Sequence, residues 1–348
     1  MSRLRTNLAF ASVAVAAVLL SVAIFAGYLE SAPSWSVVRL GYLPNVTHAQ
    51  ALYGVPAGAY EAVLGSPYTI KARAFNAGPD AILALLTNRV DLTFVGPSPT
   101  LRGLALAGPD VLRVIAGGAS GGAMFVIQPT LNLTTSADYS GKKFATPQLG
   151  NTQDIALKHF LMTQGHRTSD NGGDVEVINV PNADIMSLFQ FRRIDGAWVP
   201  EPWASRLVLE AGGKVFLDER SLWPNGRFVT TLLVTTKRYL DAHRDIVKRF
   251  LEAEVNLTLR LQNASASDLA IINDAITNVT MNRLANATIA AAFGNLNLTY
   301  DPIKSSLVTY LAWAQDLGLL PAGIDTSGLY DVSLLNEILA SRGLSPVN

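Results

Sequence analysis

The chain has 348 residues and no cysteine, and its 27 Lys and Arg residues balance its 27 Asp and Glu residues. This balance excludes the basic surface that holds nucleic acid, and the missing thiols exclude disulfides, iron–sulfur clusters, thiolate zinc sites and a lipid-modified cysteine. The length predicts about two domains. The four histidines show no ligand-like spacing, so we expect no dedicated metal site and no cofactor.

The chain opens with a segment that predicts a membrane span. Arg3 and Arg5 precede an uncharged run at residues 8–29. A helix of that length crosses a hydrocarbon core of ~30 Å, whereas a cleavable signal has a shorter apolar stretch that ends at a small-x-small site. The exit from Phe25 to Glu30 lacks such a site. We therefore expect an uncleaved anchor that holds the bulk of the protein on the extracytoplasmic face of the membrane. If the segment is instead a cleaved signal, the protein is secreted or periplasmic.

Glycosylation sequons support this location. Asn-x-Ser/Thr occurs at seven positions, five of which crowd between Asn256 and Asn297. The seven are Asn45, Asn132, Asn256, Asn263, Asn278, Asn286 and Asn297. An Asn- and Thr-rich helical stretch also generates sequons by composition alone, but the cluster favours a surface-exposed, glycosylated region.

After a short linker at residues 31–36, strand and helix signals alternate. The first strand is expected at 37–42, and a helix at 49–64 that Pro56 disturbs. Further strands are expected at 69–75, 92–95, 111–117, 124–127, 143–146, 175–180, 196–199, 214–217 and 231–236. The helices between them are expected at 78–88, 99–107, 152–164, 183–191 and 203–211. The remaining helices are expected at 245–262, 267–281, 284–293, 303–317 and 334–341. This order predicts parallel sheets of the α/β class with a helical C-terminal part.

Six loops at the ends of these strands carry small, hydroxyl or amide residues just before an expected helix. They are residues 42–50, 76–79, 96–100, 119–123, 147–154 and 198–203. Ligands of open α/β sheets lie at this edge, where a helix N-terminus stabilises an anion by ~0.3–1 kcal/mol. Capping alone explains any single loop, as in the capping box of Asn151 and Asp154. Six such loops together predict a cleft that binds an oxyanion without lysine or arginine.

The candidate ligand-binding residues come from these loops. They are Asn45, His48, Gln50, Ser98, Thr100, Ser120, Asn151, Thr152, Trp198, Glu201 and Trp203. Hydroxyl, amide and imidazole groups are expected to donate to the ligand. The two tryptophans either wall the cleft against an alkyl or aryl tail or belong to the core.

Glu201 does not fit a simple anion site, because a carboxylate repels a sulfonate. It either points away, pairs with a cation, or receives the ammonium group of a taurine-like ligand. The possible cationic partners are Arg102, Arg206 and Arg227. The sequence leaves these alternatives open.

Together, these segments resemble the solute-binding proteins of ABC importers for nitrate, aliphatic sulfonates, taurine and related anions such as bicarbonate. The matching blocks are GYLPNVTHAQA from Gly41, NAGP from Asn76, VGPSPT from Val95, AGGASGGA from Ala116, DYSGKKFATPQLGNTQD from Asp138 and IDGAWVPEPWASRLVLEAGGKVFLDERSLWPNG from Ile194. The resemblance runs from about residue 39 to about residue 251. The helical C-terminal third matches only in general character.

The resemblance implies a two-lobed, type II periplasmic-binding-protein-like fold. Residues 37–127 and 230–348 would form lobe 1 and residues 128–229 lobe 2, after a cytoplasmic stub, anchor and linker at 1–36. A small oxyanion, preferably an aliphatic sulfonate and otherwise nitrate or taurine, would bind between lobes that close on it. The protein would be a monomer without enzymatic activity, held by its anchor beside a permease and its ATPase.

Two alternatives remain open. The flat heterocycle of a thiamine or flavin precursor would stack on Tyr42, Trp198 or Trp203, and its binding would depend on those rings more than on the polar loops. An enzyme on the same fold is the other alternative. The pyrimidine synthases of thiamine biosynthesis share this architecture, but they use a cysteine-rich, iron-linked site, and this chain has no cysteine.

Overall fold

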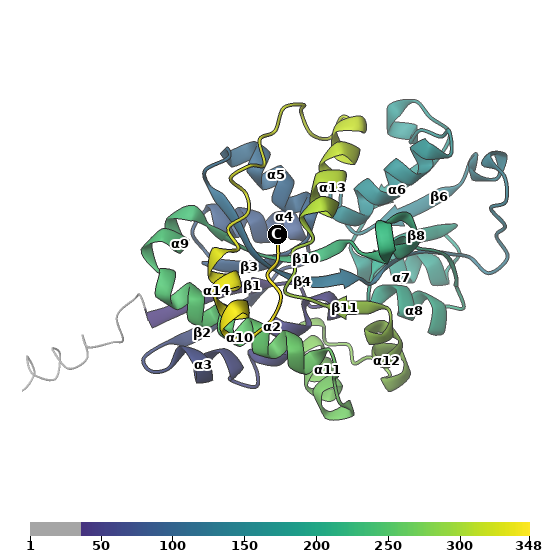
Figure 1. The fold of residues 1–348 in the computed structure, drawn as a ribbon. Coiled ribbons are helices and arrows are strands. Elements are labelled where there is room, and N and C mark those ends of the chain that lie inside the picture. The colour runs from purple at the N-terminus through teal and green to yellow at the C-terminus, as the bar shows by residue number, and fades with distance from the viewer. Residues whose placement is uncertain (1–35) are drawn as a thin grey trace, which may run out of the picture.

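The computed structural model describes residues 36–348, so the expected membrane anchor at residues 8–29 lies outside the described part of the chain. Two β-sheets stand side by side, and helices pack around both of them (Figure 1). Within residues 36–348, no helix combines the length and the apolar character that a bilayer crossing needs.

The first sheet has six strands in the order β11-β4-β10-β3-β1-β2. Their bounds are β1 Val37–Tyr42, β2 Thr69–Ala74, β3 Leu92–Val95, β4 Leu112–Gly121, β10 Val229–Thr236 and β11 Leu296–Leu298. β1 runs parallel to β2 and β3, whereas β10 runs antiparallel to β3 and β4. All residues of β3 and β4 are buried, as expected for strands covered by helices on both faces.

The second sheet has five strands in the order β7-β6-β8-β5-β9. They are β5 Ala123–Ile127, β6 Lys143–Thr146, β7 Glu176–Asn179, β8 Gly196–Pro200 and β9 Lys214–Asp218. β6 is parallel to β7 and β8, but β5 is antiparallel to β8 and β9. Both sheets are therefore mixed, which corrects the expectation of parallel sheets. The antiparallel strands β5 and β10 directly follow the two points where the chain changes sheet, and no α-helix lies between β4 and β5 or between β9 and β10.

The chain passes to the second sheet at Gly121 and Gly122 and returns through residues 219–228. Both glycines have positive φ, 74° and 70°, a conformation open to glycine without steric cost. The segment 119–123, expected to precede a helix, instead ends β4 and begins β5. Because β5 pairs within the second sheet, the change of sheet comes at these glycines rather than after residue 127, where the expected lobe boundary lies.

The helices lie close to their expected positions. They are α2 Ala49–Gly54, α3 Ala59–Leu64, α4 Gly78–Leu86, α5 Pro97–Ala107, α6 Thr152–Thr163, α7 Asn182–Gln190, α8 Trp203–Leu209, α9 Lys237–Ala242, α10 Arg244–Leu261, α11 Ala266–Thr280, α12 Asn286–Gly294, α13 Lys304–Asp316 and α14 Ser333–Ser341. The expected helix at 49–64 divides into α2 and α3 around Pro56, and the short elements α9 and β11 were not expected.

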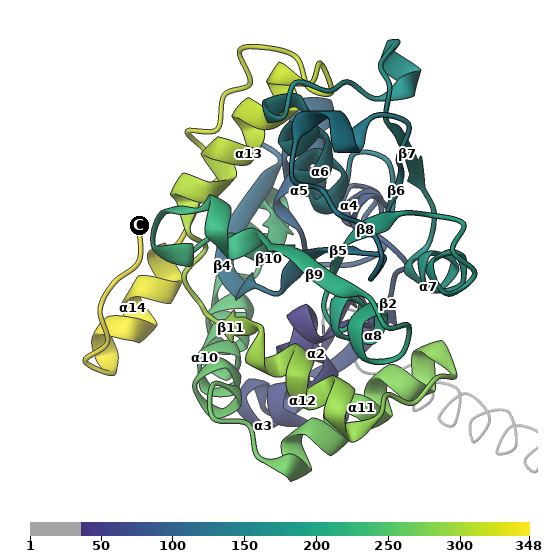
Figure 2. The same cartoon turned by 90° about the vertical axis from the view of Figure 1, so that its right-hand side faces the viewer.

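The C-terminal helices connect the two sheets. α13 packs against α5 on the first-sheet side and against α6 on the second-sheet side, and α12 packs against α8. α13 and α11 lie on opposite sides of the molecule in both views (Figures 1 and 2). The space between the sheets is thus bridged by α13 on one side, and on the α11 side by α12, which also contacts β11.

Candidate functional site

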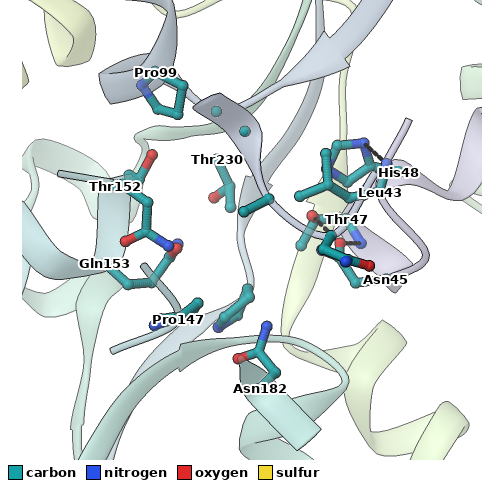
Figure 3. A pocket seen from close by; sticks show the side chains of 16 residues that line it. Leu43, Asn45, Thr47, His48, Pro99, Pro147, Thr152, Gln153, Asn182 and Thr230 are labelled. Atoms are coloured by element: carbon teal, nitrogen blue, oxygen red, sulfur yellow. Dashed lines mark hydrogen bonds between the residues drawn. The ribbon is translucent and has the colours of Figure 1, made fainter. Parts of the chain in front are cut away.

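A cavity between the two sheets is walled by chain segments that begin helices. Its lining includes the starts of α4, α5, α6 and α7 and the 3-10 helix Val46–His48. Thr152 and Gln153 lie on one side and Asn45 and Thr47 on the other (Figure 3). The cavity volume is about 40 Å³, which is room for about three water-sized molecules. The space therefore has the size of a compact polar head group.

This cavity is polar but not ionised. Among the described residues, no Asp, Glu, Lys or Arg side chain lines it. Burial lowers the pKa of His48 to about 3, so the imidazole is neutral at pH 7. Its Nδ1 accepts the Leu43 backbone N–H at 3.3 Å, which places the ring proton on Nε2. The positive potential here comes from helix N-termini and not from charged side chains.

Two asparagines at the cavity use their side-chain oxygens within the protein. Asn45 Oδ1 accepts the backbone N–H of Thr47 at 3.2 Å and its hydroxyl at 2.6 Å. Asn151 Oδ1 accepts the Asp154 N–H at 2.9 Å and so caps α6. These bonds orient both amides. Within residues 36–348, neither Nδ2 group has a hydrogen-bond acceptor, so both remain as donors to a ligand.

The loop before α6 is held from behind by the fully buried carboxylate of Asp154. Its four donors are Thr146 Oγ1 (2.9 Å), Gly150 N (2.8 Å), Lys158 Nζ (3.0 Å) and Asn179 Nδ2 (2.7 Å). The expected capping box is therefore only half formed, because this carboxylate bonds Gly150 N and not the Asn151 N–H. Lys158 balances its charge, so the cavity wall is kept in place without a charge being presented to the ligand.

Four of the predicted ligand-binding residues line the cavity: Asn45, His48, Asn151 and Thr152. Ser98 and Thr100 lie in the first turn of α5, next to the wall. The Thr100 hydroxyl donates to Gly96 O at 2.9 Å. Ser98 Oγ is buried and has no hydrogen-bond partner among the described residues.

Two further predicted residues lie away from this cavity. Gln50 is fully buried, and its Nε2 donates to Gly118 O at 2.7 Å and to Thr258 Oγ1 at 3.2 Å, which ties α2 to β4 and α10. Ser120 accepts the Phe228 N–H at 3.4 Å and lines a separate groove beside β11. Both side chains therefore make hydrogen bonds within the first sheet or where the chain crosses between the sheets.

Trp198 and Glu201 also lie away from the cavity. Trp198 stacks on Phe125 in the core of the second sheet, with 5.5 Å between ring centroids. Glu201 is fully buried and accepts hydrogen bonds from Ser205 Oγ (2.9 Å) and Asn295 Nδ2 (2.7 Å). Burial raises its pKa. Of the alternatives for Glu201, the structure therefore gives the one in which it points away and bonds neutral donors.

Several cavity residues were not predicted. They are Thr47, Asn76, Gln153, Asn182 and Thr230. Asn182 begins α7 directly after β7, so the strand-to-helix rule applied to the other loops would have found it. Thr230 lies at the start of β10, and its hydroxyl donates to Gly121 O. Because the position follows a change of sheet, no local sequence pattern marks it.

A second, wider cavity adjoins the first and shares Leu43, Asn45, Asn76 and Asn182 with it. We call this second cavity, about 270 Å³ in volume, the vestibule. The rest of its wall comes mainly from α8 and α11: Trp203, Arg206, Ile276, Val279, Thr280 and the nearby Leu284. The predicted residue Trp203 thus lies at the vestibule and not at the inner cavity.

Solved structures with the same architecture are known. The alkanesulfonate-binding protein SsuA of Xanthomonas axonopodis pv. citri, bound to MOPS, is 18% identical, with a TM-score of 0.69 over 85% of this chain and 99% of that one. The periplasmic nitrate-binding protein NrtA of Synechocystis PCC 6803 is 17% identical, with a TM-score of 0.73 over 88% of this chain and 89% of that one. These likenesses confirm the expected two-lobed α/β binding-protein fold.

The sequence comparisons agree. The taurine-binding periplasmic protein of Escherichia coli (strain K12) is 26% identical over 220 residues, which are 61% of this chain. The match spans 65% of that relative's length, slightly less than two thirds of it. The model of the NMT1-like family matches residues 31–272. Since this match covers more than half of the sequence, the chain belongs to the NMT1-like family.

Proposed function

We propose that this chain is the extracytoplasmic solute-binding component of an ABC importer and that it captures a small oxyanion, preferably an aliphatic sulfonate. The observation that carries the proposal is the meeting of four helix N-termini around one small cavity without an ionised side chain. Each N-terminus stabilises an anion by ~0.3–1 kcal/mol when exposed and by up to ~2 kcal/mol when partly buried. A strong-acid anion such as a sulfonate keeps its charge in such a site, because it is too weak a base to take up a proton from the neutral donors around it.

The residues proposed to hold the anion are those that line the inner cavity: Asn45, His48, Asn151 and Thr152, with Gln153 and Asn182 added. The two unpaired Nδ2 groups of Asn45 and Asn151, the Nε2–H of His48 and the Thr152 hydroxyl are all hydrogen-bond donors. The names of the relatives agree with this chemistry, since they bind taurine, alkanesulfonate and nitrate.

The two alternatives receive less support. Apart from the His48 imidazole, no aromatic side chain among the described residues lines the inner cavity, so a flat heterocycle has no ring there on which to stack. Catalysis by an ionised acid or base also lacks a candidate at this cavity, since His48 is neutral and no carboxylate or amine lines it. Binding without chemistry is the function that this lining supports best.

Location and partners follow from the same proposal. Residues 8–29 would anchor the protein, a monomer, on the extracytoplasmic face, beside its permease and ATPase. Six of the seven sequon asparagines are exposed, whereas Asn45 is only 6% exposed at the cavity. If glycans are attached, we therefore expect them at the six exposed positions and not at Asn45.

A thermal-shift panel on the full chain in detergent tests the proposal. The ligands are methanesulfonate, propane-1-sulfonate, taurine, sulfate, nitrate, bicarbonate and a pyrimidine precursor of thiamine. A ligand at a hundredfold excess over its Kd stabilises the folded state by ~2.7 kcal/mol. We expect sulfonates to raise the Tm. A shift with the pyrimidine alone would overturn the proposal. So would the lack of a shift with every anion up to about 10 mM, which is 10⁴ times a micromolar Kd and corresponds to a stabilisation of ~5 kcal/mol.

A further inference from the structure

The vestibule differs in chemistry from the inner cavity. Leu43, Pro44, Trp203, Ile276 and Val279 give it a mainly apolar wall. Its volume of about 270 Å³ is several times the 40 Å³ of the inner cavity. The two spaces adjoin at the four residues that they share, so the vestibule is the space next to the head group of a ligand bound in the inner cavity. Figure 2 shows α8 facing α11 at this end of the molecule.

The charges at the vestibule are one-sided. Among the described residues, no Asp or Glu lines it, and its one charged lining residue is Arg206. The Arg206 guanidinium lies over the Trp203 ring, 4.7 Å from the ring centroid. Arg206 Nε also donates to Glu210 Oε2 at 3.0 Å, and Glu210 Oε1 accepts the Thr288 hydroxyl at 3.1 Å. Both oxygens of the Glu210 carboxylate therefore already accept a hydrogen bond.

This arrangement disfavours a cationic tail for three reasons. An ammonium group that leaves water needs a carboxylate or several acceptors, and the vestibule wall presents no carboxylate. The Arg206 guanidinium adds a repulsion, which its ion pair with Glu210 weakens. One face of the Trp203 ring is already covered by Arg206, which leaves a cation only the other face. An uncharged alkyl or aryl tail meets none of these costs and gains from contact with the apolar wall.

We propose that the vestibule is a tail-binding subsite that selects sulfonates with an uncharged organic tail and discriminates against the ammonium tail of taurine. The Trp203–Arg206 pair and Val279 are its specificity-determining residues. This inference rests on the proposed function, because it places the sulfonate head group in the inner cavity. It also separates this chain from its taurine-binding relative in substrate preference.

A matched pair of ligands tests the subsite. Propane-1-sulfonate and taurine have nearly the same shape and differ in a terminal methyl group against a terminal ammonium group. Each methylene that is fully buried increases affinity about fourfold. We expect propane-1-sulfonate to bind the full chain at least tenfold more tightly than taurine and also more tightly than methanesulfonate, with the Kd values measured by isothermal titration calorimetry.

The variant Val279→Asp supplies the missing carboxylate. Val279 is 41% exposed on α11, so the change should leave folding intact. It should shift the ratio of the two Kd values at least tenfold toward taurine, and the ratio cancels any effect on the shared sulfonate group. The matched control is Val308→Asp, because Val308 is 48% exposed on α13 and does not line the vestibule. It should leave the ratio unchanged.

The outcomes separate the two proposals. If methanesulfonate binds but taurine binds as tightly as propane-1-sulfonate, the tail subsite is refuted and the oxyanion proposal stands. An equal response of the Val279→Asp and Val308→Asp ratios refutes the subsite as well. If neither methanesulfonate nor any other sulfonate binds, the proposed function fails, and the subsite fails with it.

Discussion

The inner cavity and the connection between the sheets around Glu201 and Glu219, which we call the hinge, are both buried and polar, yet their hydrogen bonding differs. At the cavity, side-chain donors such as the Asn45 and Asn151 amides are left without acceptors in the described part of the chain. At the hinge, the carboxylates of Glu201 and Glu219 are fully buried and bonded to donors from both sides. Unused donors indicate a place for a ligand, whereas fully used acceptors indicate a structural connection.

Glu219 shows how complete the hinge connection is. It follows β9 where the chain starts back toward the first sheet. Trp198 Nε1 on β8 donates to it at 2.7 Å, and the Tyr310 hydroxyl on α13 donates at 2.5 Å. Burial raises the pKa of this carboxyl to about 7, although the hydrogen bonds from Tyr310 and Trp198 oppose the increase. The carboxyl thus joins the core of the second sheet to a helix that also contacts the first-sheet side.

The largest expected effect comes from a negative charge placed in the cavity. Asn182 is the first residue of α7, where an aspartate is favourable for the helix. In Asn182→Asp, however, a carboxylate ~4 Å from a bound anion costs about 4 kcal/mol at an effective dielectric constant of ~20. We expect oxyanion affinity, measured by calorimetry, to fall by at least a hundredfold, and the Tm to fall as well, because Asn182 Oδ1 is buried without a hydrogen-bond partner among the described residues.

The control for this variant is Asn286→Asp, the same change at the first residue of α12, where the side chain is exposed. Its affinity should equal that of the unmodified protein. If Asn182→Asp also bound the anion normally, the inner cavity would not be the anion site. The unused donors at the cavity would then not indicate a place for a ligand.

The next largest effect concerns the hinge. Glu219→Ala leaves the Trp198 and Tyr310 donors buried without acceptors, which should lower the free energy of unfolding by about 3 kcal/mol in a denaturant titration. Glu219→Gln keeps an acceptor and should cost less. Stability rather than ligand specificity is the expected readout, because Glu219 does not line the cavity.

The raised pKa of Glu219 also predicts that the free energy of unfolding depends on pH. Its pKa is about 7 in the folded protein against an ordinary 4.5, so between these values the folded state holds the proton that the unfolded state has lost. Glu219 therefore makes stability fall by ~3 kcal/mol as pH rises from 4.5 to 7, with no further change above. Glu219→Gln should remove this slope. An unchanged slope in that variant would show that the carboxyl titrates normally.

The smallest expected effect comes from pushing apart the starts of α5 and α6, which lie on two sides of the cavity. A Cβ on Gly96, at the start of α5, would lie 2.6 Å from Thr152 Oγ1 at the start of α6. The backbone of Gly96 suits alanine, with φ −70° and ψ 162°. Gly96→Ala should therefore weaken oxyanion binding about tenfold by holding the two sides apart, and leave the Tm nearly unchanged. The control Gly294→Ala, where a Cβ meets nothing within 4 Å, should bind normally.

Local sequence patterns predicted what depends on local chemistry. Asn45 and Asn151 were found because a capping residue before a helix is recognisable within a few positions, and both line the cavity. The directions of the Trp198 and Glu201 side chains stayed open at the sequence level, because they depend on distant partners. Asn295, which bonds Glu201, is 94 residues away in sequence. The antiparallel strands were missed for the same reason, since the sequence does not show where the chain changes sheet.

The bridging position of α13 has a mechanical consequence. This helix contacts α5 and α6 on the two sides of the cavity, whereas the vestibule opens between α8 and α11 on the opposite side. The vestibule side is held as well, because α12 packs against both β11 of the first sheet and α8 of the second-sheet side. Any rotation about α13 therefore has to shift α12 along α8, so the α12–α8 contact sets how far the vestibule can open.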